Sequence, residues 1–431
     1  MPQKLLFDEM EADDRAVARE QRSGSFVDNM QLPVHRWFRY SAGFSACWAG
    51  EVIREMAGGG SLHVLDPFAG SGTVVLEAER AGAEGMGIEA HPFVARIARA
   101  KLLWREDSKA LRQMGTRIVR AAEKNGGSND GYAALIKKCY APETLARLDA
   151  LKKSLMSVSN EGNVGELCWL TLVSILRVAS PVGTAQWQYI LPRKMKARSV
   201  EPFEAFEERV GVLARDILAW KKHVAAPRGC VLCADARTCE GVPDGWADLV
   251  VTSPPYANNY DYADATRLEM TFLGEINGWG DLQQTIRTHL VRSCTQHVGP
   301  IAGRTPEVLK EPVLTPIVAE LTAACARLDA EKENHGGKKH YHAMLAHYFL
   351  DMGHVWRALR RVTRRGGRAC FVIGDSAPYG IHVPVDRWLG ELAVAAGFKS
   401  FRFEKLRDRN TKWLNRKHRV PLHEGRLWVE G

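Results

Sequence analysis

The amino-acid sequence predicts an α/β protein with a doubly wound, mostly parallel sheet and helical insertions. The first observation is a β-α-β pattern, in which apolar runs at 62–65 and 85–88 flank a helical run at 73–81. The second is that strand patterns resume at 230–232 and 249–252, after a long and mostly helical stretch. The third is the order of elements near the C-terminus, where helices alternate with strands.

The C-terminal elements complete the predicted sheet. We expect a helix at 341–363, a strand at 369–373, and a helix at 384–396 that ends at Gly397. The segment 399–404 has the pattern of an edge strand. The sheet is therefore expected to be parallel except for one antiparallel edge strand.

Composition and charge describe a folded, basic protein. The chain has 431 residues, of which 45% are hydrophobic, enough for the core of one large or two ordinary domains. Lys and Arg exceed Asp and Glu by 59 to 50, and the net charge of +9 suits a polyanionic partner without requiring one. The nine cysteines are scattered and do not have the spacing of the disulfide framework of a secreted domain. No signal peptide or membrane span is recognisable. We expect a cytoplasmic protein without membrane contact.

A Gly-rich turn, Asp66-Pro67-Phe68-Ala69-Gly70-Ser71-Gly72-Thr73, follows the first strand. Its glycines allow a tight turn and a close approach of the backbone to a ligand at the start of the next helix. No Lys follows them, so the loop is not of the type that binds a nucleoside triphosphate. Glu89, at the end of the next strand, can accept hydrogen bonds from both ribose hydroxyls of a nucleoside.

A second motif, Thr252-Ser253-Pro254-Pro255-Tyr256, follows the apolar strand at 249–252. The two prolines make a rigid turn that lacks backbone donors and directs carbonyl oxygens into a cleft. An aromatic residue follows this turn immediately. The pattern predicts a cleft beside this turn that is rich in hydrogen-bond acceptors.

Together the two motifs resemble those of amino-group DNA methyltransferases that use S-adenosylmethionine. The D-P-F-A-G-S-G-T run is similar to the cofactor motif of that family, and S-P-P-Y is similar to the catalytic motif of its cytosine N4 members. Adenine N6 members usually carry Asp or Asn at the position of Ser253. Here the cofactor motif precedes the catalytic one, whereas many S-P-P-Y cytosine enzymes have the reverse order. That difference leaves the choice of base more open than the type of reaction.

The resemblance implies a Rossmann-like methyltransferase fold and a set of cofactor contacts. Asp235 matches the acidic residue near the adenine amino group, and the segment around Phe44 and Ser45 matches an N-terminal element that closes over the methionine moiety. The cofactor-binding residues implied are Phe44, Ser45, Asp66, Pro67, Phe68, Gly70, Ser71, Gly72, Thr73, Glu89 and Asp235.

The catalytic residues implied are Ser253, Pro254, Pro255 and Tyr256. An exocyclic amine is a poor nucleophile, so a site must accept hydrogen bonds from its hydrogens and draw the nitrogen toward sp³ geometry. The Ser253 hydroxyl and the Pro254 carbonyl would do so, and Tyr256 would stack on a base flipped out of double-stranded DNA. No Pro-Cys pair occurs, so the covalent chemistry of cytosine C5 enzymes is not expected.

Further residues are candidates for DNA contacts. Asn259 and Tyr260 follow the catalytic turn and could line the base pocket or cap the next helix. Arg193, Lys194 and Lys196 form a basic run that would hold phosphates or lie on a solvated face. We expect no metal, because the Cys residues at 230, 233 and 239 have no second pair nearby.

The resemblance also divides the chain into segments. They are an N-terminal arm (1–30), a first catalytic part with the cofactor loop (31–104), a helical insertion that is a candidate target-recognition region (105–225), a second catalytic part (226–273), a second insertion or flexible loop (274–340), and a C-terminal catalytic part (341–431).

The predicted function is site-specific DNA methylation, with cytosine N4 favoured. The alternatives are an adenine N6 DNA methyltransferase, an RNA guanine N2 methyltransferase, and a DNA-binding protein without activity. The last is disfavoured because Glu89 and both loops are intact. A restriction or defence-system partner stays an open expectation.

Overall fold

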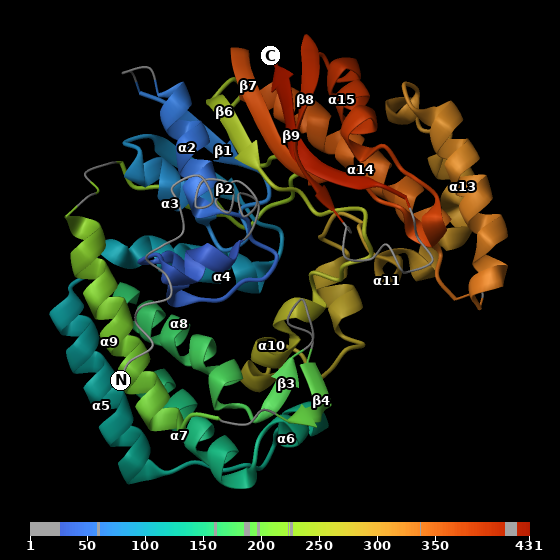
Figure 1. The fold of residues 1–431 in the computed structure, drawn as a ribbon. Helices are drawn as coiled ribbons and strands as arrows, with labels where there is room; N and C mark the ends of the chain where they lie inside the picture. Colours follow the sequence, from blue (N-terminus) through green and yellow to red (C-terminus); the bar gives the residue numbers. More distant parts are fainter. Residues whose placement is uncertain are drawn as a thin grey trace, which may run out of the picture.

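A computed structural model describes residues 26–57, 61–158, 162–184, 190–195, 199–222, 224, 227–336, 338–409 and 420–431. Its centre is a seven-stranded sheet in the order β5-β2-β1-β6-β7-β9-β8 (Figure 1). The strands are β1 (His63–Asp66), β2 (Glu84–Ile88), β5 (Cys230–Leu232), β6 (Ala247–Thr252), β7 (Thr363–Gly374), β8 (Ser400–Arg409) and β9 (Leu422–Glu430).

The sheet confirms the predicted α/β, Rossmann-like methyltransferase fold. The five strands from β5 to β7 run parallel, and antiparallel pairing is confined to the edge formed by β7, β9 and β8. The strand expected at 399–404 is the edge strand β8, and the strand with reversed direction is its neighbour β9. Charged residues interrupt the apolar pattern of β9, and they pair across to β8, as Glu424 does with Arg407. Its sequence pattern therefore gave no prediction of a strand.

Helices cover both faces of the sheet. Alternate strand residues such as Val64 and Val251 pack under α2 (Ala46–Met56) and α3 (Thr73–Arg80). On the opposite face, Val250 and Phe371 belong to the core with α14 (Tyr341–Val362) and α15 (Val385–Ala395), where Trp356 stacks on Phe371. Strands buried on both sides read as continuous apolar runs, which is why β1 and β6 are visible in the sequence.

A helical unit follows the second strand and lies below the sheet in Figure 1. Its elements are α4 (Pro92–Lys101), α5 (Ser108–Asn125), α6 (Ala134–Cys139), α7 (Pro142–Val158), α8 (Gly162–Ala179), α9 (Pro202–Lys221) and a hairpin of β3 (Val182–Thr184) and β4 (Ile190–Met195). Helix α8 is long and apolar enough to cross a membrane, but 61% of it is buried and it packs against α4, α5, α7 and α9. It is the core helix of this unit.

A second helical stretch packs against α14 beside the sheet. It contains α11 (Thr295–Val298), α12 (Thr305–Val308) and α13 (Val318–Lys332), whereas α10 (Arg267–Leu273) packs against α6 and α8 of the first helical unit. Short 3₁₀ or π turns are η1 (Phe26–Gln31), η2 (His35–Trp37), η3 (Leu102–Arg105), η5 (Asp264–Thr266), η6 (Gln283–Arg287), η7 (Gly299–Arg304), η8 (Pro312–Leu314), η9 (Glu333–His335) and η10 (Pro378–Gly380). These connections bring residues from distant parts of the chain to the carboxyl ends of the strands.

Candidate functional site

A cavity lies at the carboxyl ends of β1, β2 and β6. This is the edge at which open α/β sheets bind ligands. Ten residues predicted from the sequence line it, namely Phe44, Pro67, Phe68, Gly70, Ser71, Thr73, Glu89, Asp235, Ser253 and Pro255. The structure thus brings the Gly-rich turn and the Ser-Pro-Pro turn to one cavity.

The two glycines of the Gly-rich turn have different surroundings. Both have positive φ, 51° at Gly70 and 85° at Gly72, which other residues rarely adopt. A Cβ on Gly70 would lie 3.1 Å from the Tyr40 ring, whereas one on Gly72 would lie 3.3 Å from Ala98 in α4. Gly70 therefore lets the turn pack against the cavity wall, and Gly72 lets α3 approach α4 without lining the cavity.

Asp66 lies behind the cavity. It is fully buried, and its Oδ1 accepts hydrogen bonds from the Phe68 amide at 3.0 Å and the Thr252 hydroxyl at 2.6 Å. These bonds tie the end of β1 to the end of β6, and hence one loop to the other. Burial raises the Asp66 pKa to about 7 even though both hydrogen bonds oppose that shift.

Glu89 faces the cavity from the end of β2. Its two carboxylate oxygens accept hydrogen bonds from the backbone amides of Gly70 at 2.9 Å and His91 at 2.8 Å. Burial raises its pKa to about 7, against the effect of these two bonds. The side chain is fixed in place, and each oxygen retains lone pairs for a further donor.

Asp235 follows β5 and lines the same cavity. Arg237 holds it through several hydrogen bonds, the shortest 2.6 Å, and Arg237 also contacts the buried Asp351 of α14 at 3.3 Å. On the opposite wall, the Phe44 carbonyl accepts from the Asn29 side chain at 2.8 Å. Ser45 does not line the cavity, because its hydroxyl caps α2 by accepting from the Trp48 amide at 3.3 Å.

The Ser-Pro-Pro-Tyr turn follows β6. The Ser253 hydroxyl donates to the Val372 carbonyl at 3.3 Å, so its oxygen lone pairs remain available as acceptors. Pro254 is buried and Tyr256 partly buried, and neither lines this cavity. The Tyr256 amide donates to the Tyr262 hydroxyl at 3.3 Å, and the Arg409 guanidinium lies 5.4 Å from the Tyr256 ring centre. Burial raises the Tyr256 pKa, so its phenol stays neutral.

Two of the candidate substrate residues, Asn259 and Tyr260, line a second cavity beside the catalytic turn. Asn259, with φ of 67°, accepts from the Thr295 amide at 2.8 Å and so joins the turn to the second helical stretch. The Tyr260 hydroxyl lies 3.4 Å from that of Ser41, and Tyr260 lines this cavity with Asn259. Arg193 and Lys194 lie on β4, and Lys196 lies outside the described residues.

Several lining residues are absent from the sequence prediction. They are Tyr40, Ala42, Gly43, Ala69, Ile88, Ala90, His91, Ala236, Tyr262, His289, Leu290 and Val291. Most neighbour a predicted motif and could have been included with it. His289, Leu290 and Val291 come from the second helical stretch, where no local pattern marks them.

Two further histidines are buried. His347 of α14 is 3% exposed, and its Nδ1 lies 2.8 Å from the Arg292 guanidinium. His91 is buried as well, and its pKa is lowered to about 3 by burial. It is therefore neutral at physiological pH, with Nε2 3.0 Å from the Thr266 hydroxyl.

Comparison with known proteins gives relatives over most of the chain, although no family model matches it. The chain is 25% identical over 402 residues to proteins named Type II methyltransferase M.AvaI from Nostoc sp. and Anabaena variabilis, covering 87% of this chain and 81% of each relative. It is 22% identical over 449 residues to Type II methyltransferase M.BsoBI from Geobacillus stearothermophilus, covering 93% and 86%. The chain is thus similar, over nearly its full length, to proteins named as type II methyltransferases.

Proposed function

We propose that this protein is a DNA methyltransferase that transfers a methyl group from S-adenosylmethionine to an exocyclic amine, with cytosine N4 as the favoured acceptor. The observation that carries the proposal is that Ser253 and Pro255 line the same cavity as Gly70 and Glu89. A cofactor loop and an acceptor-rich turn therefore share one space. The similarity to type II methyltransferases along most of the chain supports the same reaction class.

The residues that line the cavity suit a nucleoside with an amino-acid chain attached. Glu89 offers carboxylate lone pairs for ribose hydroxyls, while Phe68, Ile88 and Val291 offer apolar surface for an adenine ring. Asp235 stands where an adenine amino group could donate to it. The wall at Tyr40 and Phe44 would cover the methionine end.

S-adenosylmethionine supplies an electrophilic methyl group bonded to a sulfonium sulfur. Ser253 and the Pro254 carbonyl would accept hydrogen bonds from the two amino hydrogens of the base, which localises the nitrogen lone pair. Ser253 donates to the Val372 carbonyl at 3.3 Å and also hydrogen-bonds the Tyr256 phenol, so a remaining lone pair of its oxygen would accept from the amine. Tyr256, held by Tyr262 and Arg409, would stack on the flipped base and position it for attack.

The choice of cytosine rests on Ser253 alone. A serine hydroxyl at this position is the feature shared with cytosine N4 enzymes, and adenine N6 enzymes are the second candidate. Both bases present an exocyclic amine with two hydrogens, so the same acceptors would serve either. The enclosing residues of the second cavity, including Tyr260 and Arg409, would then decide between the two rings.

The experiment is to incubate the protein with methyl-labelled S-adenosylmethionine and either genomic DNA or total RNA. We expect label in DNA only. Ser253→Ala should lower turnover by about 10²-fold, the effect of losing one polar contact made in the transition state, and should change cofactor affinity little. Ser157→Ala on α7, where the hydroxyl bonds only within its own helix, is the matched control and should behave as wild type.

Two results would contradict the proposal. One is label in RNA and none in DNA, which would move the protein to another substrate class. The other is full turnover by Ser253→Ala, which would remove that hydroxyl from the reaction.

A further inference from the structure

A cluster of two carboxylates and an imidazole lies beside the second cavity. Asp375 follows β7, Asp386 stands in the first turn of α15, and His423 belongs to β9. We propose that these three residues bind a divalent transition-metal cation, of the Mn²⁺ or Zn²⁺ type. This site lies outside the proposed cofactor cavity and does not depend on the proposed function.

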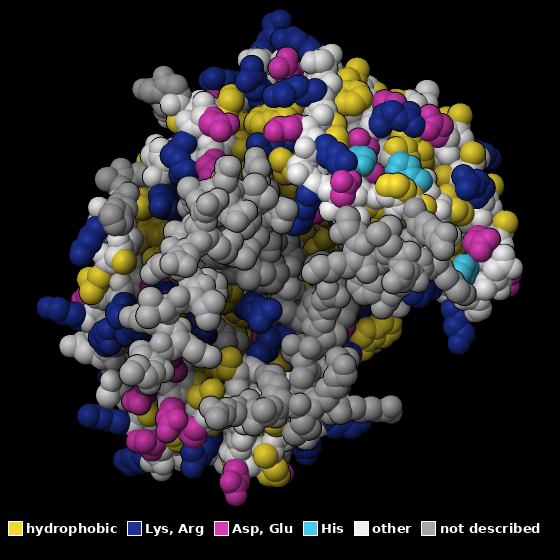
Figure 2. Space-filling model, in the orientation of Figure 1, with side chains coloured by type: hydrophobic (Ala, Val, Ile, Leu, Met, Phe, Trp, Pro, Cys, Tyr) yellow, Lys and Arg dark blue, Asp and Glu magenta, His cyan; other side chains and the backbone are white. Residues whose placement is uncertain are grey.

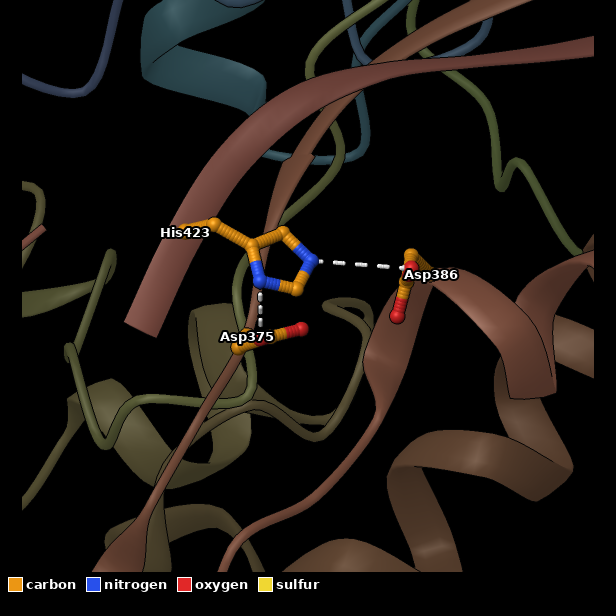
Figure 3. A group of neighbouring side chains, drawn as sticks. All are labelled: Asp375, Asp386 and His423. Atoms are coloured by element: carbon orange, nitrogen blue, oxygen red, sulfur yellow. Dashed lines mark ion pairs between the residues drawn. The ribbon is translucent and has the colours of Figure 1, made fainter. Parts of the chain in front are cut away.

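The donor atoms are already close together. One ligand atom from each residue lies within 4.8 Å of the others. The His423 Nδ1 is 2.8 Å from Asp375 Oδ2, and its Nε2 is 3.6 Å from Asp386 Oδ2, as the dashed lines in Figure 3 show. The two contacts involve different ring nitrogens, and a single ion would use only one of them, together with one oxygen from each carboxylate.

The Asp375 carboxylate points to a missing partner. Its side chain is fully buried, and Oδ2 contacts His423 and, at 3.1 Å, His382. Its Oδ1 is buried without any hydrogen-bond partner. Figure 3 shows this second oxygen turned toward the gap between the His423 ring and Asp386. An uncompensated buried carboxylate oxygen is unfavourable, and a cation in the gap would satisfy it.

Charge and donor type indicate the kind of ion. Two carboxylates and a neutral imidazole would be balanced by one divalent cation. Mixed oxygen and nitrogen donors suit Mn²⁺ and Zn²⁺, whereas Mg²⁺ and Ca²⁺ prefer oxygen donors alone. The cluster has no thiolate, which would favour a softer ion. His382 would then orient Asp375 by donating to Oδ2, as outer partners do at metal sites.

Another histidine between two acids provides an internal comparison. His63 lies 3.6 Å from Glu84 and 3.7 Å from Asp248, so it also stands between two carboxylates. Among the described residues, however, only the Asp375 cluster brings three donor atoms together within 4.8 Å. His63 is therefore the matched control.

The proposed ion would join three elements at one point. It would hold the ends of β7 and β9 to the start of α15, and Asp375 and Arg409 line the second cavity beside the Tyr256 turn. Metal binding should consequently make this wall of the cavity more rigid. Chain separation explains why the sequence predicts no metal there, since the ligands are 11 and 37 positions apart.

The test is a titration of EDTA-treated, full-length protein with Mn²⁺, without DNA or cofactor, following the electron paramagnetic resonance of free Mn²⁺. Mn²⁺ is the first probe because the exposed Cys230 and Cys233 bind it poorly. Competition with Zn²⁺ then shows which ion the site prefers. We expect one Mn²⁺ per wild-type chain, at least about tenfold weaker binding in Asp386→Asn, and unchanged binding in His63→Gln.

Asp386→Asn is chosen because, in the part of the chain that the structure describes, Asp386 forms an ion pair only with His423, at 3.6 Å. The fold should therefore survive the substitution, as circular dichroism can check. Mn²⁺ should also raise the melting temperature of wild type and His63→Gln, but not that of Asp386→Asn. The proposal is overturned if wild type takes up neither Mn²⁺ nor Zn²⁺. It is equally overturned if folded Asp386→Asn binds either ion as tightly as wild type.

Discussion

At the scale of residues, two carboxyl groups have strongly raised pKa values, Glu89 in the cavity wall and Asp66 behind it. Asp66 and Glu89 both have pKa values raised to about 7 by burial, although backbone amides bond to each. Asp66 uses its bonds to link two strands, and Glu89 uses them to fix a carboxylate toward the cavity. A carboxyl group with a raised pKa stabilises the fold below its unfolded pKa of about 4, and that contribution is lost as pH rises through about 7.

This titration predicts a pH dependence of cofactor binding. Ribose hydroxyls donate best to an ionised carboxylate, so the affinity of wild type for S-adenosylmethionine should rise by up to about tenfold between pH 6 and pH 8. Calorimetry at several pH values measures it. Glu89→Gln removes the titrating carboxyl group. Titration of S-adenosylmethionine itself affects wild type and variant alike, so it cancels in the ratio of their affinities. A ratio that stays constant with pH would contradict the role of Glu89.

Local chemistry explains which site residues the sequence could indicate. Positive φ at Gly70 and Gly72 demands glycine, and the prolines after Ser253 fix a rigid turn, so both loops are visible as motifs. The sequence could not show which residues turn toward the cavity. Asp66 faces Thr252, which is distant in the chain, and Gly72 faces α4.

At the scale of elements, the helical unit holds the N-terminal wall of the cavity. Asp216 of α9 is buried and accepts from the Arg36 guanidinium, from the Trp37 indole at 3.0 Å and from the Val34 amide at 3.3 Å. Val34 has φ of 64°, an unfavourable value for a β-branched residue. Asp216 thus fixes the chain just before Tyr40 and Phe44.

Asp216→Ala should therefore act on both stability and binding. Three donors lose the acceptor that they share, which should lower the free energy of unfolding by about 2–4 kcal/mol. The partial exposure of Arg36 keeps the loss from being larger, because water can replace part of that contact. Cofactor affinity should fall as well, because the wall at Tyr40 loses its anchor. Urea denaturation and calorimetry measure the two effects. Asp107→Ala, which removes an exposed cap of α5, is the control and should lower stability without changing affinity.

The elements differ in how far the sequence predicts them. Strands β1, β2 and β6 are short apolar runs that end at motifs, and α14 and α15 show helical periodicity. Strand β9 and the β3–β4 hairpin lack such a pattern. In β9 the charged side chains are matched by partners on β8, a relationship that one strand alone does not reveal.

At the scale of the whole molecule, the protein is basic, and its charged side chains surround the proposed site. Figure 2 shows Lys and Arg side chains spread over both the sheet and the helical unit, with acidic side chains among them. Binding of DNA would then need local contacts as well as the net charge of +9. The hairpin strand β4, with Arg193 and Lys194, is our candidate for phosphate contacts.

Arg193→Ala combined with Lys194→Ala should weaken DNA binding for all sequences alike. It should also reduce the slope of log affinity against log salt concentration by about 2, and leave cofactor affinity unchanged. Fluorescence anisotropy at several salt concentrations measures this. Arg117→Ala with Arg120→Ala removes the same charge from the exposed face of α5, and we expect a smaller change in slope. Equal slopes for the two double variants would contradict a phosphate role for β4.

The identity of the methylated base distinguishes cytosine N4 from the other possible acceptors. DNA treated with the protein and methyl-labelled S-adenosylmethionine would be digested to nucleosides and analysed by mass spectrometry. We expect labelled N4-methylcytosine. Labelled N6-methyladenine would retain the fold and the chemistry of the amine but contradict the choice of base, and 5-methylcytosine would contradict the mechanism itself.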